Sequence, residues 1–205
     1  NTANLHHPSF LNNIDTIITP FAPKEFQELQ PDILLTFGGM VVSKRIKAFL
    51  RTYKPAHHWH IDSLRAYDTY GVLTQHFKVE PNPFFKQFLS FAIPISSNYF
   101  STFDAIAKLR ETKHQDYLNK IPFSDFKVFE KIIPSLPENS MLHLSNSSAI
   151  RYAQLIPVHP SIQVFCNRGT SGIDGSTSTA IGAAVANERP TVLIAGDIGF
   201  LYDSN

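Results

Sequence analysis

The sequence has little of several features that mark particular classes of protein. Its 205 residues include one cysteine, Cys166, so no disulfide can form within the chain, which suits a reducing compartment. The 18 Lys and Arg residues nearly balance the 17 Asp and Glu residues, and the net charge is +1. Such a balance gives no general attraction for nucleic acid or for an anionic membrane. Any anion site must therefore be built locally.

The sequence also lacks a long hydrophobic run. Its most apolar stretch, NPFFKQFLSFAIPI, contains Lys86 and Gln87 and is too short to span a bilayer. No basic segment followed by an apolar one indicates a secretory signal. The chain starts without methionine and stops just after an apparent strand, so we expect a fragment. We also expect a cytoplasmic protein with no stable membrane insertion and no nucleic-acid partner.

Strand and helix patterns alternate in the first half of the chain. Residues 32–39, DILLTFGG, form an apolar run closed by two glycines, which is typical of a buried parallel strand. Residues 40–53 place apolar side chains at helical spacing, and residues 57–62 again resemble a strand. This succession predicts a parallel sheet with a right-handed crossover. The pattern weakens over residues 65–100, and residues 103–120 predict an exposed helix.

A second series of strands and helices follows a helix that Ser124 is expected to cap. Three apolar strands, SMLHL, IQVFCN and PTVLIAG, are each followed by a loop and helix or by the end of the chain. We therefore predict an α/β protein of two three-layer α/β/α units with mainly parallel sheets. Residues 1–115 form the first, Rossmann-like domain, and residues 116–205 form the second, which is incomplete.

Polar residues follow each of the three strands of the second unit. Asn146 and Ser147 begin a helix that carries Arg151 one turn later, Arg168 precedes three glycines, and Asp197 follows the third strand directly. Ligands of open α/β sheets bind beyond the carboxyl ends of the strands. If these strands are neighbours, one crevice holds a carboxylate suited to a hard cation, arginines suited to carboxylates, and glycine backbone.

Each of these features also has a structural interpretation. Asp197 could cap a helix, Arg151 and Arg168 could form surface ion pairs, and the glycine loop could be a tight turn beside a packed helix. Neither a phosphate-binding P-loop nor a GxGxxG fingerprint is present. The histidines of HHWH alternate along a strand, which argues against a metal site there. No base is evident near Cys166 that would activate it as a nucleophile, so a buried structural role is favoured.

Three motifs together give a resemblance to a known family. NRGTSGIDG, with SNSSAIR upstream and GDIGFLYDSN downstream, closely resembles the thiamine-diphosphate-dependent synthases of menaquinone biosynthesis in order and spacing. SKRIKAF is similar to a Lys-Arg segment of their central domain. The resemblance is strong over residues 145–205 and weaker before them. It implies that the two domains are the central domain and the start of a thiamine-diphosphate-binding domain.

The resemblance also implies a role for each cofactor-side residue. Asp197 would ligate the Mg²⁺ (or Mn²⁺) that holds the diphosphate of thiamine diphosphate. Ile173 would be the aliphatic wedge that keeps the cofactor bent, and Gly172 would offer its carbonyl to the cofactor's amino group. Asn146 and Gly196 would complete the cofactor-binding set.

Five residues would face the substrates. Ser147, Arg151 and Arg168 would line the substrate side, and Lys44 and Arg45 would reach in from the central domain. The implied reaction is a carboligation in which 2-oxoglutarate is decarboxylated and the succinyl carbanion adds in a 1,4 sense to isochorismate. Both substrates are dicarboxylates, which explains the four cationic side chains.

The family's catalytic glutamate and second metal ligand, an asparagine, are expected outside this chain. We therefore expect the fragment to catalyse nothing by itself, and the full-length protein to be a homodimer or homotetramer. Two alternatives stay open. One is another thiamine-diphosphate 2-oxoacid decarboxylase or an acetolactate synthase-like carboligase, although these usually have glycine where this chain has Ile198. The other is a non-catalytic module that binds an anion or nucleotide.

Overall fold

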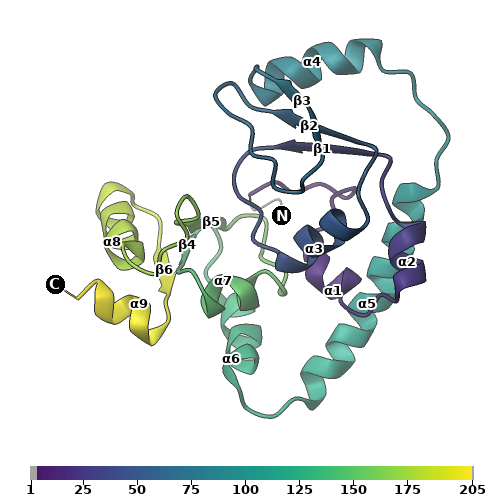
Figure 1. Cartoon of the computed structure of the whole chain (residues 1–205). Coiled ribbons are helices and arrows are strands. Elements are labelled where there is room, and N and C mark those ends of the chain that lie inside the picture. Colours follow the sequence, from purple (N-terminus) through teal and green to yellow (C-terminus); the bar gives the residue numbers. More distant parts are fainter. Residues whose placement is uncertain (1–3, 205) are drawn as a thin grey trace. The chain divides into compact units, whose positions relative to one another are not determined.

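The computed structural model describes residues 4–204 and shows an α/β protein with two separate parallel sheets (Figure 1). The described residues form two compact units. One comprises residues 18–106, and the other comprises residues 107–204 together with residues 4–17. The change between them falls within helix α5 (Tyr99–Lys120). The division into domains at residue 115 stays a prediction.

The unit of residues 18–106 contains the sheet β1-β2-β3, named here sheet A. Its strands are β1 (Ile33–Phe37), β2 (His57–Ile61) and β3 (Leu73–Phe77), all parallel and in sequential order. Helix α3 (Lys44–Thr52) connects β1 to β2, and the Ser43 hydroxyl caps it by accepting a hydrogen bond from the Ile46 amide at 3.0 Å. The first two strands and this helix confirm the prediction from sequence.

Residues 65–100 contain two elements that the sequence pattern did not reveal. Strand β3 and helix α4 (Pro81–Phe91) both lie in this stretch. Proline is tolerated in the first turn of a helix because the amide it lacks would have no partner there, so Pro81 and Pro83 begin the helix. Phe84 packs on Phe77 of β3 with ring centroids 4.9 Å apart, which ties α4 to the sheet.

The second unit contains the sheet β5-β4-β6, named here sheet B. Its parallel strands are β4 (Met141–Leu144), β5 (Gln163–Cys166) and β6 (Thr191–Ile194), with β4 in the middle. Leu144 is paired with Cys166 on one side and with Ile194 on the other, so the three strands end level. The three predicted strands are confirmed, and they are neighbours.

Sheet B is covered on both faces. Helix α7 (Ser148–Ala153) links β4 to β5, and α8 (Ser176–Ala186) links β5 back across β4 to β6. Because right-handed crossovers in opposite directions leave the sheet on opposite faces, α7 and α8 lie on opposite sides of β4 (Figure 1). This arrangement confirms the predicted three-layer α/β/α architecture.

Helix α9 (Asp197–Tyr202) follows β6, and α6 (Asp125–Ile132) precedes β4. Ser124 caps α6 as predicted, because its hydroxyl accepts a hydrogen bond from the Lys127 amide at 3.4 Å. Within residues 4–204, no helix combines the length and the apolar character needed to cross a membrane. The remaining elements are α1 (Ile14–Ile18), α2 (Pro23–Glu28) and the 3₁₀ helix η1 (Ile133–Ser135).

Candidate functional site at the carboxyl edge of sheet B

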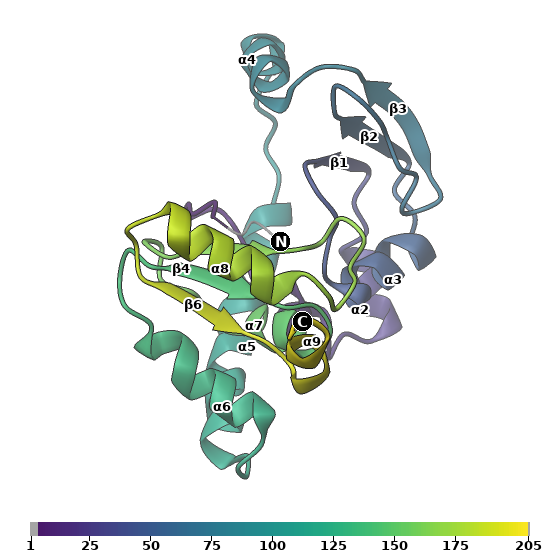
Figure 2. The same cartoon turned by 90° about the vertical axis from the view of Figure 1, so that its left-hand side faces the viewer.

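The carboxyl ends of β4, β5 and β6 bring the three predicted motifs together. Helices α7 and α9 both begin at this end of the sheet (Figure 2). The buried hydroxyl of Ser145, directly after β4, accepts a hydrogen bond from the Gly196 amide after β6 at 3.3 Å. The condition on which the sequence argument depended, that these strands lie side by side, is therefore met. This edge is called the crevice below.

Asn146 joins the end of β4 to the loop after β5. Its side-chain Nδ2 donates to the carbonyl oxygens of Asn167 at 2.8 Å and Gly172 at 2.5 Å. Its Oδ1 accepts from Arg168 Nη1 at 2.7 Å and, more weakly, from the Cys166 thiol at 3.5 Å. Asn146 is only 4% exposed, so its amide is committed to the protein itself. Direct contact of this side chain with a cofactor stays a prediction.

Ser147, directly before α7, and Arg151, in the last turn of this helix, have exposed side chains. Ser147 has φ 69° and ψ −125°, a conformation that is unfavourable for a residue with a Cβ atom. Strain of this kind costs on the order of 1–3 kcal/mol and is concentrated at functional positions. A strained serine with an exposed arginine one turn later is consistent with the predicted substrate side of the site.

Arg168 is half-buried and incompletely paired. One terminal nitrogen, Nη1, donates to Asn146, whereas Nε is buried and has no hydrogen-bond partner among the described residues. A guanidinium presents its donors in a planar fork that fits a carboxylate. Of the guanidinium nitrogens, Asn146 accepts only from Nη1, so the group keeps further donors for an anion. Arg168 is thus not the surface arginine with one ion-pair partner that the structural interpretation describes.

A residue that the sequence argument missed occupies the N-terminus of α8. The Asp203 carboxylate accepts hydrogen bonds from the amides of Gly175 and Thr177, each at 2.6 Å. These two bonds lower the pKa of Asp203 below its ordinary value. Gly175, with φ 76°, makes the turn into the helix. Since Asp203 supplies this end of α8 with an anion, an external anion is not required there.

Asp197 is exposed at the first position of α9. Its Oδ1 accepts a hydrogen bond from the next amide, Ile198, at 2.8 Å, and Gly196 takes the capping position. The carboxylate therefore keeps acceptor capacity for a cation. Within residues 4–204, no cluster of three or more His, Cys, Asp or Glu side chains could hold a metal. An open cavity of about 400 Å³ lies here, lined by Leu193, Ala195, Gly196, Asp197 and Phe200.

Gly199 brings α9 against the glycine loop. A Cβ atom at this position would lie 3.1 Å from the Ile173 carbonyl oxygen and 4.0 Å from the Ser145 hydroxyl. Only glycine therefore allows this approach without a shift of the loop. The half-buried Ile173, the predicted wedge, therefore packs against α9 at Gly199.

Lys44 and Arg45 are exposed in the first turn of α3, in the other unit. Their expected approach to the substrates stays a prediction. Cys166 is half-buried on β5, and burial raises the pKa of its thiol above the ordinary value. A thiol held in its protonated form is a poor nucleophile, which supports the structural interpretation of this residue.

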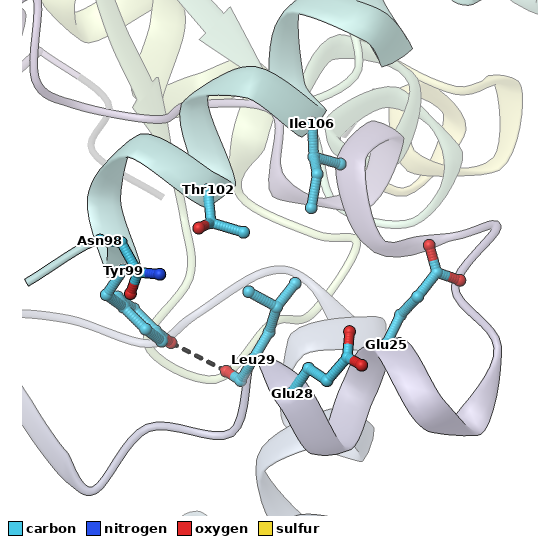
Figure 3. Close-up of a pocket in the computed structure, with 7 residues that line it drawn as sticks. All are labelled: Glu25, Glu28, Leu29, Asn98, Tyr99, Thr102 and Ile106. Carbon is cyan, nitrogen blue, oxygen red and sulfur yellow. Dashed lines mark hydrogen bonds between the residues drawn. The ribbon is translucent and has the colours of Figure 1, made fainter.

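A second cavity, of about 340 Å³, lies in the unit of residues 18–106 (Figure 3). The Tyr99 hydroxyl donates to the Leu29 carbonyl there at 2.9 Å, and burial raises the pKa of Tyr99 to about 12. Two carboxylates and no cationic side chain line this cavity, so it is unsuited to a dicarboxylate. The lining residues are Glu25, Glu28, Leu29, Asn98, Tyr99, Thr102 and Ile106.

No family model matches the chain. Curated relatives, however, match it from end to end. A protein of Flavobacterium johnsoniae is 67% identical over 204 residues, and one of Flavobacterium psychrophilum is 63% identical over 204 residues. A protein of Christiangramia forsetii is 51% identical over 209 residues. All three bear the name 2-succinyl-5-enolpyruvyl-6-hydroxy-3-cyclohexene-1-carboxylate synthase. Over its whole length, the chain is homologous to these synthases.

The three matches cover 100% of this chain but only 36–37% of the relatives, which are much longer. The resemblance that the sequence motifs indicated is therefore confirmed. The synthase name belongs to the longer relatives.

Proposed function

We propose that this chain is part of a thiamine-diphosphate-dependent synthase, a carboligase of the transferase class in menaquinone biosynthesis. In it, the chain supplies the substrate-carboxylate site and one side of the cofactor site. The observation that carries the proposal is that three motifs meet at one edge of sheet B, where β4 pairs with β5 on one side and with β6 on the other. High identity to synthases over the whole chain supports it.

The residues at the crevice fit part of a thiamine-diphosphate site. Asp197 offers an exposed carboxylate to Mg²⁺ or Mn²⁺, with Gly196 beside it. The Gly172 carbonyl accepts one bond from Asn146 and keeps a second lone pair for the cofactor's amino group. Ile173 supplies the aliphatic support. When bound, the cofactor supplies an electron sink for decarboxylation of a 2-oxoacid.

The cationic side chains fit the proposed substrates, 2-oxoglutarate and isochorismate, which are both dicarboxylates. Arg168 would bind a carboxylate through the guanidinium donors that Asn146 does not use. Ser147, directly before α7, and Arg151, within that helix, are both exposed. Lys44 and Arg45 would complete the set from the first unit. Their task is to hold the substrates in one orientation, which removes most of the entropic cost of bringing two molecules together.

The groups missing from this set would come from other parts of the full-length protein. These are the glutamate that activates the cofactor and the asparagine that completes the metal site, and without them we expect the chain alone to be inactive. We propose that the full-length protein works in the cytoplasm as a homodimer or homotetramer. The short span of this chain relative to its relatives supports a division of the site over a longer polypeptide.

The test is consumption of 2-oxoglutarate by the full-length protein with thiamine diphosphate and Mg²⁺, with and without isochorismate. We expect rapid consumption only when isochorismate is present, and a large loss on Arg151→Ala. Consumption that ignores isochorismate, or activity with pyruvate alone, would favour a decarboxylase or acetolactate synthase-like enzyme instead. Cofactor binding without any turnover would favour a non-catalytic module.

A further inference from the structure

We propose that Asn146 is a positioning residue that fixes both the Arg168 guanidinium and the Gly172 carbonyl. The inference rests on the proposed function for what these two groups bind. Its physical basis is independent of that function, because one buried amide holds both groups. The Nδ2 of Asn146 donates to Gly172 O at 2.5 Å and to Asn167 O at 2.8 Å, and Oδ1 accepts from Arg168 Nη1 at 2.7 Å.

The orientation of this amide is determined by its partners. The carbonyls of Asn167 and Gly172 can only accept, and Arg168 can only donate, so exchanging the amide oxygen and nitrogen would break all three bonds. Both donors of Nδ2 are used. Among residues that fit this space, asparagine is the one that provides two donors and an acceptor in one plane. Aspartate keeps the size but loses both donors.

Asn146 acts on the two sides of the crevice at once. On one side it holds the loop that carries Gly172, whose carbonyl oxygen keeps a second lone pair for the proposed cofactor. On the other side it anchors one arm of Arg168 and leaves Nε without a protein partner. Arg168 is thereby held in one orientation before the substrate arrives. Asn146 therefore contributes to substrate and cofactor affinity through these groups.

The first test uses amide hydrogen exchange of the cofactor-free, full-length protein. In Asn146→Ala we expect the Arg168 amide, which donates to the Cys166 carbonyl at 2.8 Å, to exchange about tenfold faster, the effect of losing one or two net hydrogen bonds. Asn146→Asp should behave the same way, because it loses the donors while keeping the volume. The matched control is Asn187→Ala, at the end of α8, whose side chain also bonds a backbone amide.

If Asn146→Asp exchanged like the wild type, the side chain would only fill space and the proposal would be wrong. Unchanged exchange in Asn146→Ala would overturn it as well. A general rise in exchange across the unit would indicate lost folding instead of lost positioning. It would contradict the proposal unless the Arg168 amide lost protection in the Asp variant beyond that general rise.

The second test is a double-mutant cycle between Asn146→Ala and Arg168→Ala, read in the KM for 2-oxoglutarate. We expect Asn146→Ala to raise this KM about tenfold in the wild-type background, as for a lost hydrogen bond to a charged group. In the Arg168→Ala background it should raise it little, because the two residues act as one unit. Additive effects would contradict the proposal. If the wild type consumes no 2-oxoglutarate, the proposed function fails, whereas the exchange test still decides the role of Asn146.

Discussion

Sheets A and B each have three parallel strands, but their polar residues lie in different places. In sheet A the chain moves from β1 to β2 to β3 in one direction, whereas in sheet B it reverses at β4. Sheet A uses its polar side chains within the sheet, where the Thr36 hydroxyl lies 2.8 Å from both His58 Nε2 and His60 Nδ1. Sheet B places Asn146 and Arg168 beyond its strands.

The difference follows from topology. Where the strand order reverses, the connecting helices leave on opposite faces, and the loops at the strand ends separate to form a crevice. Among the described residues of sheet A no such reversal occurs. A parallel sheet with suitable residues is therefore not enough for a site. The order of the strands decides whether those residues can converge.

The largest effects should come from the central strands, which are the most deeply buried in both sheets. Leu142 of β4 and Ile61 of β2 are each 0% exposed. Truncating either to alanine should cost about 2–5 kcal/mol of unfolding free energy, from lost burial and the cavity left behind. Urea unfolding of the two variants measures this. A loss below 1 kcal/mol, roughly the cost of a surface change, at either position would contradict the assignment of that strand to a core.

The next effect separates the crevice from the opposite end of sheet B. Arg168→Ala should lower kcat/KM for 2-oxoglutarate about a hundredfold in the full-length protein, because charge-assisted bonds to a carboxylate are lost. Arg189→Ala is the matched control, since this exposed arginine precedes β6 at the other end of the strand. Steady-state kinetics would contradict the assignment if the two variants lost activity equally.

A smaller effect of opposite sign is expected at Ser147. Its φ of 69° suits glycine, so Ser147→Gly should stabilise the protein by about 1 kcal/mol while reducing activity. Ser148→Gly, one residue later within α7, should instead destabilise it by up to about 1 kcal/mol, because glycine is a poor helix former. Thermal unfolding of both variants checks the signs. Destabilisation by Ser147→Gly would show that the serine conformation is not strained.

The smallest effect is a pH dependence that originates in sheet A. Burial lowers the pKa values of His58 and His60 below the ordinary histidine value of 6.5. The unfolded chain therefore binds protons first, and stability that is complete above pH 6.5 is lost as the pH falls through the lowered values. Burial acts in the same direction on His143 of β4, so the measurement must resolve the two sheets.

Hydrogen exchange of β1 and β2 as a function of pH provides that resolution. Protection should decrease on acidification in the wild type and depend less on pH in His58→Gln, which cannot be protonated. A pH-independent wild type would show that these histidines titrate normally.

Much of sheet B could be predicted because its strands are apolar runs that end in capping residues, as in SMLHLSNSS. The same rule failed for β3, whose sequence LTQHF has a polar centre, and for α4, which begins with prolines. The order β5-β4-β6 depends on long-range packing that no local pattern records. The bond from Asp203 to Gly175 spans 28 residues, and the contacts of Asn146 join two loops, so neither had a local signal.

The most direct test of the crevice is the hydrogen-exchange footprint of thiamine diphosphate and Mg²⁺ on the full-length protein. Protection should increase at residues 168–173 and 195–198, which follow β5 and β6, and should be lost in Asp197→Ala. The residues that follow β2 and β3 of sheet A should show no comparable change. Protection centred on sheet A, or binding that leaves the ends of β5 and β6 unchanged, would contradict the assignment of the ligand site to sheet B.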